Sequence, residues 1–183
     1  MYRHILAAID GSQTSARAFN AALQIARESG AELQPLYVVD VPLMVYDAPS
    51  YDPGIVRDAF VEEGKKLIDD ALAQMKHDGI EGTPRTIETN PVGDDFDVAR
   101  CILHAAADLK ADLVVMGTHG RRGVRRLVLG SVAERFLRIA ECPVLMISAH
   151  GLPEVATDTS GAPEGRNQTR NEPRSEPKST RGG

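Results

Sequence analysis

Short, continuous apolar runs alternate with longer stretches of helical periodicity along the first 150 residues, and this alternation limits the possible folds more than any other feature. The apolar runs predict strands at 4–10 ("HILAAID"), 33–40 ("LQPLYVVD"), 84–89 ("PRTIET", the poorest), 112–117 ("DLVVMG") and 143–148 ("PVLMIS"). The periodic stretches predict helices at 12–30, 54–79, about 98–109 and 131–139. Strands that are apolar throughout are buried on both faces, so the order βαβαβαβαβ predicts an α/β fold with a doubly wound, open parallel sheet between two helical layers.

Length and charge exclude several classes of protein. The chain has 183 residues and a formal net charge of −5, which allows one domain with a full core and gives no indication of a nucleic-acid or membrane partner. No apolar run approaches the ~20 residues of a membrane span, and the first residues lack a signal-peptide cleavage site, so a cytoplasmic location is predicted. Cys101 and Cys142 have no metal-site spacing and are expected to be buried thiols rather than a disulfide.

The composition changes near residue 150. Residues 151–183 have no aromatic side chain and are rich in Pro, Gly, Ser, Thr and balanced charge, so they bury too little surface to offset the entropy of ordering. We therefore expect one domain at 1–150 and a disordered polar tail at 151–183, with an interaction segment as the less favoured interpretation of the tail.

The stretch "MGTHGRRGVRRLVLGS" follows the fourth strand and carries most of the functional information. Gly117 and Gly120 are expected to adopt positive φ angles and to bring backbone N–H groups close to a ligand. Gly130 and Ser131 stand at a predicted helix start, where free N–H groups and the helix dipole favour an anion such as phosphate. The alternative is that these glycines only form turns and a helix cap. The spacing matches neither the Walker loop nor the Rossmann dinucleotide motif.

A ligand site is expected at one edge of the predicted sheet. Ligands of doubly wound sheets bind beyond the carboxyl ends of the strands, where the strand order reverses. Asp10 closes the first strand, Val39 and Asp40 close the second, and Gly117 closes the fourth. If the first and fourth strands are neighbours, the loops after Asp10 and Gly117 face each other across one crevice.

The pattern Gly117-x2-Gly120-x9-Gly130-Ser131 resembles the nucleotide-binding signature of the universal stress proteins, in their ATP-binding branch. The resemblance covers residues 2 to about 149. It includes the first strand and its loop, "ILAAIDGSQTS", the run "ADLVVMGTHGRRG" and the strand after "CP". The resemblance implies the strand order 3-2-1-4-5, a homodimer that pairs through strand 143–148, and ATP, with or without Mg²⁺, between the first and fourth strands.

The resemblance also implies a role for individual residues. Asp10 would lie near the adenine and ribose, the backbone of Val39 or its neighbour Val38 would contact adenine, and Met116 and Gly117 would shape the ribose pocket. The implied phosphate contacts are Gly120, Gly130, Ser131 and Val132. His119 lies inside the motif and is a further candidate phosphate contact. Segment 41–54 varies in this family, so the lid of the pocket is not predicted.

Other polar residues have simpler interpretations. The arginines beside the glycine stretch are expected to form a solvated loop edge rather than phosphate ligands: Arg121, Arg122, Arg125 and Arg126. A general-base role for His119 is disfavoured because no carboxylate or nucleophile is evident beside it. His104 is expected to be a structural histidine, and the acids of "GDDFD" at 93–97 to cap a helix rather than bind a metal.

Two classes of function remain open from the sequence. The first is a regulatory nucleotide-binding protein, read by its dimer or by an unidentified protein partner. The second is an enzyme, either a slow ATPase or a nucleotide-dependent enzyme of a related α/β fold. Phosphoryl transfer needs a placed base and charge clamps, and only Asp10 and His119 are candidates, so binding with little or no turnover is favoured.

Overall fold

A computed structural model describes residues 1–41, 52–90, 97–120 and 129–148. By its contacts the chain divides into two units, Met1–Gly151 and Leu152–Gly183, and all the described elements belong to the first. The predicted tail at 151–183, most of the lid segment and the four arginines between Gly120 and Leu129 lie outside the described residues.

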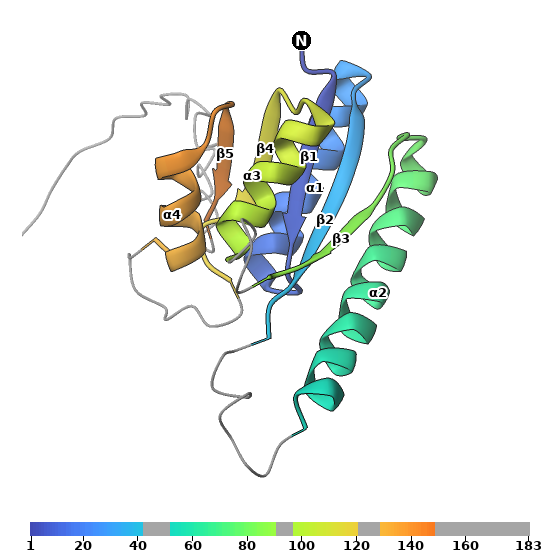
Figure 1. The fold of residues 1–183 in the computed structure, drawn as a ribbon. Helices are drawn as coiled ribbons and strands as arrows, with labels where there is room; N and C mark the ends of the chain where they lie inside the picture. Colours follow the sequence, from blue (N-terminus) through green and yellow to red (C-terminus); the bar gives the residue numbers. More distant parts are fainter. Residues whose placement is uncertain (42–51, 91–96, 121–128, 149–183) are drawn as a thin grey trace, which may run out of the picture. The chain divides into compact units, whose positions relative to one another are not determined.

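The described elements alternate strictly between strand and helix (Figure 1). Their bounds are β1 His4–Ile9, α1 Gln13–Ser29, β2 Glu32–Val39, α2 Pro53–Asp78, β3 Arg85–Glu88, α3 Val98–Leu109, β4 Leu113–Gly117, α4 Ser131–Ile139 and β5 Val144–Ile147. The strands form one parallel sheet in the order β3-β2-β1-β4-β5. The predicted fold class and strand order are therefore confirmed.

The helices cover the two faces of the sheet in pairs, as Figure 1 shows: α1 and α2 on one face, α3 and α4 on the other. Successive side chains of a strand point to opposite faces, so β1 contributes to both cores. Ile5 and Ala7 pack with α1 and α2, whereas Leu6 and Ala8 pack toward α3 and α4. This burial on both faces explains why the central strands have no polar alternation in the sequence.

Helix ends follow local signals in the sequence. Ser12 caps α1 by accepting a hydrogen bond from the Ser15 N–H, and Gly30 ends the helix in the left-handed conformation with φ of 67°. Helix α2 begins at Pro53, a favoured first position, and ends before Gly79, whose φ is 68°. Asp97 caps α3 through the N–H groups of Ala99 and Arg100, which confirms the capping interpretation for this residue.

The short edge strand β3 is attached to both helical layers by ion pairs. Arg57 of α2 binds both carboxylate oxygens of Glu88, at 2.7 and 2.8 Å. Arg85 contacts Asp108 of α3 at 2.8 Å. These contacts hold a strand that has only four residues and that the sequence predicts least clearly. In the described part of the chain, none of the helices has the length and apolarity needed to cross a bilayer.

Candidate functional site

The site lies where the strand order reverses. Strands β1 and β4 are adjacent and parallel, so the loops that leave their carboxyl ends lie together. The Thr14 hydroxyl at the start of α1 donates a hydrogen bond to the His119 carbonyl in the loop after β4. The predicted meeting of these two loops across one crevice is thus observed.

A cavity of about 760 Å³ opens at this point. Apolar side chains of the sheet and of α3 form much of its wall, among them Leu36, Val38, Ile102 and Met116. Its polar lining is Asp10, Ser15, Asp40, Thr118, His119 and Ser131. An apolar pocket with a few convergent polar groups is the usual form of a small-molecule site.

Most of the residues proposed from the sequence line this cavity, and Val39 is the exception. The lining residues are Asp10, Val38, Met116, Gly117, His119, Gly120, Gly130, Ser131 and Val132. Val39 is 1% exposed, packs in the core on the α1 and α2 side, and its carbonyl accepts a hydrogen bond from the Thr89 N–H at 3.0 Å. Its neighbour Val38, whose side chain points to the other face, is the residue that reaches the cavity.

The expectation that Gly117 and Gly120 adopt positive φ is wrong. The described glycines with positive φ are Gly11, Gly30, Gly79 and Gly82. The site glycines are needed instead because other groups approach them closely, as a β carbon built at each position shows. At Gly117 it would lie 3.0 Å from the Thr14 Cβ and Oγ1 atoms, at Gly120 2.6 Å from Asp10 Oδ2, and at Gly130 3.0 Å from the Thr118 carbonyl oxygen.

The start of α4 presents backbone donors to the cavity. The helix begins at Ser131 with Gly130 as its cap, as predicted, and no side chain caps it. The Gly130 N–H donates to the Thr118 carbonyl at 2.8 Å, which joins the helix start to the loop after β4. The first N–H groups of any helix have no partner within the helix, so those beside Ser131 and Val132 are available to an anion.

Asp10 and His119 have defined surroundings. Asp10 Oδ1 accepts a hydrogen bond from the Ser12 N–H at 2.9 Å, which orients the carboxylate at the end of β1. His119 Nδ1 lies 3.0 Å from the Thr118 hydroxyl, and its Nε2 is buried with no hydrogen-bond partner. Within the described ranges no carboxylate contacts either ring nitrogen, so the histidine lacks the orienting partner that a general base uses.

Sequence reasoning missed part of the cavity wall. Phe60, Val98 and Ile102 pack on the inner faces of their helices, and they also reach the cavity. Helical periodicity identifies the buried face of a helix and does not show which part of that face lies beside a cavity. Ser15 was also missed, because a serine in a helix's first turn is more typical of capping than of a pocket wall.

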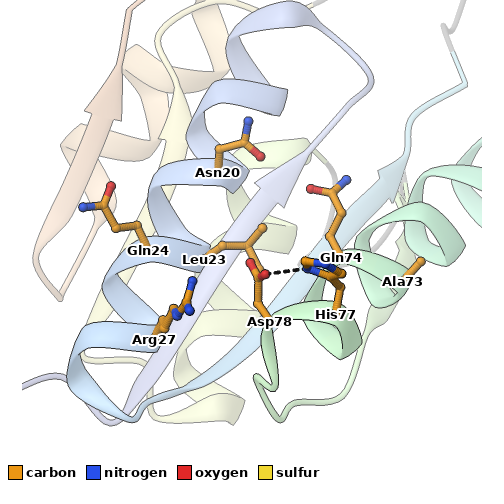
Figure 2. Close-up of a pocket in the computed structure, with 8 residues that line it drawn as sticks. All are labelled: Asn20, Leu23, Gln24, Arg27, Ala73, Gln74, His77 and Asp78. Carbon is orange, nitrogen blue, oxygen red and sulfur yellow. Dashed lines mark hydrogen bonds and ion pairs between the residues drawn. The ribbon is translucent and has the colours of Figure 1, made fainter.

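His104 and the two cysteines do not line the cavity. His104 is half-buried on α3. Neither Cys101, which is buried, nor Cys142, which is half-buried, forms a disulfide with a described residue, and burial raises the pKa of the Cys142 thiol. A second hollow lies between α1 and α2, and Figure 2 shows the side chains that line it. Among them, His77 Nδ1 lies 2.9 Å from Asp78 Oδ1. None of the residues proposed from the sequence lines it.

Comparison with known proteins gives one consistent family. Residues 1–148 match the sequence model of the Universal stress protein family. A universal stress protein of Methanocaldococcus jannaschii is 34% identical over 147 residues, covering 80% of this chain and 82% of that protein. A crystal structure of a universal stress protein family member from Burkholderia pseudomallei is 47% identical, with a TM-score of 0.66 over 80% of this chain and 96% of that one. A universal stress protein solved in complex with cAMP is 26% identical, with a TM-score of 0.55 over 80% of this chain and 97% of that chain.

Proposed function

Since the chain belongs to the universal stress protein family, we propose that it binds ATP in the cavity at the carboxyl ends of β1 and β4. The observation that carries this proposal is the convergence of Asp10, the Gly117 to Gly120 loop and the Gly130–Ser131 helix start on one cavity. The volume of about 760 Å³ lies within the range of small-molecule sites.

Each part of the nucleotide has a matching surface. The apolar wall formed by Val38, Ile102 and Met116 suits a purine ring. The Asp10 carboxylate is an acceptor for the ribose hydroxyls. The free N–H groups at the start of α4 suit the phosphates. The complex of a relative with cAMP supports an adenine nucleotide as the ligand class.

We propose a regulatory role with little or no turnover. Phosphoryl transfer requires a base or water-orienting group together with charge clamps. The carboxylate of Asp10 is oriented by the Ser12 N–H, and His119 has no carboxylate partner among the described residues. A Mg²⁺ that accompanies ATP would find the Asp10 and Asp40 carboxylates on the cavity lining. Bound ATP would stiffen the site, and a cytoplasmic partner or the dimer would respond to that state.

The homodimer that we propose uses β5, an edge strand in the described sheet. An apolar edge with open N–H and C=O groups is commonly covered or paired. The side chains of β5 are all only partly buried within one chain, which favours a partner strand at this edge.

Two measurements test the proposed function. Purified protein is denatured and any released nucleotide is identified by chromatography, and nucleotide-free protein is titrated with ATP, with and without Mg²⁺, by calorimetry. We expect one bound ATP per chain, and negligible phosphate release when the protein is incubated with excess ATP. Absence of binding to any adenine nucleotide would refute the proposal, and sustained phosphate release over many turnovers, even at a low rate, would favour the slow-ATPase alternative over a regulatory protein.

A further inference from the structure

The first turn of α1 contains buried polar side chains that face the loop after β4. Thr14 is 5% exposed and Ser15 is 4% exposed, and they are the buried polar residues of the described chain. Ser15 lines the cavity, whereas Thr14 does not. Burying a hydroxyl is costly unless it is hydrogen-bonded, so the partners of Thr14 indicate what its burial achieves.

Thr14 contacts the end of β4 and the beginning of the loop that follows it. Its hydroxyl donates to the His119 carbonyl and lies 3.1 Å from the Ser12 hydroxyl. A β carbon at Gly117 would lie 3.0 Å from the Thr14 Cβ and Oγ1 atoms, so the end of β4 packs directly against this side chain. Thr14 therefore helps to hold the chain from Gly117 to His119, together with the bonds from the Thr118 N–H to the Ile147 carbonyl and from the Gly130 N–H to the Thr118 carbonyl.

The bond to the His119 carbonyl also fixes a neighbouring donor. In a planar trans peptide the C=O of one residue and the N–H of the next point in opposite directions. Because the His119 carbonyl is held toward α1, the Gly120 N–H is directed away from α1. That N–H makes no hydrogen bond to any other described residue, and Gly120 lines the cavity together with Gly130 and Ser131. A donor with no partner and a fixed direction is suited to a phosphate oxygen.

We propose that Thr14 is a positioning residue that sets the affinity of the site for the phosphates of the nucleotide without contacting the ligand. The inference rests on the proposed function. Removal of the hydroxyl leaves the His119 carbonyl with only the longer bond from the Ser12 hydroxyl, at 3.5 Å, so the peptide between His119 and Gly120 is held less firmly and the phosphate donor loses its fixed direction. The nucleoside half of the cavity is formed by other residues, among them Val38 and Met116, and keeps its shape.

The test compares Thr14→Ser and Thr14→Ala, which differ by a single hydroxyl oxygen, with Thr14→Val as the isosteric variant. Calorimetry gives the dissociation constants of ATP and of adenosine, which has no phosphate. We expect Thr14→Ala and Thr14→Val to weaken ATP binding about tenfold, the upper effect of one hydrogen bond, with little change for adenosine. Thr14→Ser should restore ATP binding to within about threefold of wild type.

The control is Ser29→Ala, which removes a hydroxyl that donates to the Ile25 carbonyl at 2.6 Å at the far end of the same helix. Melting curves without nucleotide show whether each variant is folded, and the Ser and Ala variants of Thr14 remain comparable if Thr14→Val does not fold. The dissociation constant of adenosine divided by that of ATP should fall in Thr14→Ala and stay unchanged in Ser29→Ala. A merely structural loss would weaken the binding of both ligands together and leave this ratio unchanged.

Several results would overturn the inference that the Thr14 hydroxyl positions the phosphate donor. Equal weakening of ATP and adenosine in Thr14→Ala, unchanged ATP binding in that variant, or failure of Thr14→Ser to restore binding would each show that the hydroxyl does not position the phosphate donor. If wild-type protein binds neither ligand, the proposed function fails first, and this inference fails with it.

Discussion

At Gly120 a β carbon would lie 2.6 Å from the Asp10 Oδ2 atom, so an alanine fits only if the carboxylate moves. The Asp10 side chain is held on its other oxygen by the Ser12 N–H. We expect Gly120→Ala to displace the carboxylate and to weaken ATP binding about tenfold, equivalent to about 1.4 kcal/mol, with little change in melting temperature because Gly120 is exposed.

A double-mutant cycle separates this cause from a direct effect on the loop. Asp10→Ala removes the carboxylate, so adding Gly120→Ala to it should cost much less than Gly120→Ala costs alone. Titration of ATP into the two single variants and the double variant provides the comparison. Additive losses would mean that Gly120 acts independently of Asp10.

Asp112 connects the start of β4 to the start of β1. Its carboxylate accepts hydrogen bonds from the Arg3 N–H, at 3.1 and 2.8 Å, and from the His4 N–H at 3.1 Å. Burial raises the pKa of Asp112, but these backbone N–H groups and the nearby His4 lower it, and the net pKa lies below the ordinary value of 3.8. A carboxyl whose pKa is lower in the folded state stabilises the fold above its unfolded pKa, and the contribution is lost as pH falls through the folded pKa.

Asp112→Asn should therefore lower the free energy of unfolding by about 1 kcal/mol near neutral pH, and the difference from wild type should shrink below about pH 4. Urea unfolding at a series of pH values measures it. Asp108→Asn is the control, since Asp108 is 63% exposed in its pair with Arg85 and should change stability less. A difference that grows as the pH falls would contradict the assignment.

For single residues, the sequence predicted which of them lie at the cavity better than it predicted why each is needed there. Asp10, His119 and Ser131 reach the cavity as expected, because the ends of strands and the starts of helices can be located from periodicity and capping residues. The reason for the glycines could not be predicted, since the close approach of Thr14 to Gly117 joins residues that are distant in the chain.

Among the elements, α2 lies close to β2 because it carries a glycine at the contact. A β carbon at Gly64 would lie 2.4 Å from Cδ1 and 2.5 Å from Cε1 of Tyr37, whose side chain is fully buried. Phe60, one turn earlier on the same helix, lines the cavity. The Gly64 contact thus sets the distance at which α2 contributes to the site.

We expect Gly64→Ala to destabilise the protein, although alanine is the better helix former by about 1 kcal/mol. Overpacking against a buried ring costs about 1–3 kcal/mol and should be the larger effect. Urea unfolding measures the change. In a Tyr37→Val background the clash is absent, so the same substitution should become stabilising. A stabilising effect in the wild-type background would show that α2 moves away from β2 at no cost.

For the fold as a whole, the sequence predicted the order of elements and the layers, because burial on both faces leaves uniformly apolar strands such as β1 and β4. The strand order came from the family resemblance and not from periodicity, since no local pattern states which strands are neighbours. A similar limit applies to Val39, which closes β2 as predicted but whose side chain packs in the core beside α1 and α2 and does not line the cavity. Alternation along a strand shows that neighbours differ in direction and not which of them faces the ligand.

The proposed dimer can be tested at the open edge of β5. The Val114 N–H donates to the Pro143 carbonyl and the Thr118 N–H donates to the Ile147 carbonyl, and Met116 is in register with Met146. In a parallel ladder this pattern directs the Met146 N–H and C=O away from β4, toward the open edge. Its side chain, however, packs in the core beside α3 and α4. A lysine at position 146 would therefore disturb the core as well as the edge.

Met146→Pro and Met146→Ala isolate the contribution of the edge. Both variants lose the packed side chain, but only proline also removes the outward N–H, and proline is tolerated on an edge strand at such a position. We expect Met146→Pro to sediment as a monomer and Met146→Ala to remain a dimer, with cooperative melting in both. Light scattering over a range of protein concentrations provides a second measure of mass. If Met146→Pro is as dimeric as wild type, the subunits associate through another surface, because a strand pair centred on β5 loses a central hydrogen bond in each chain.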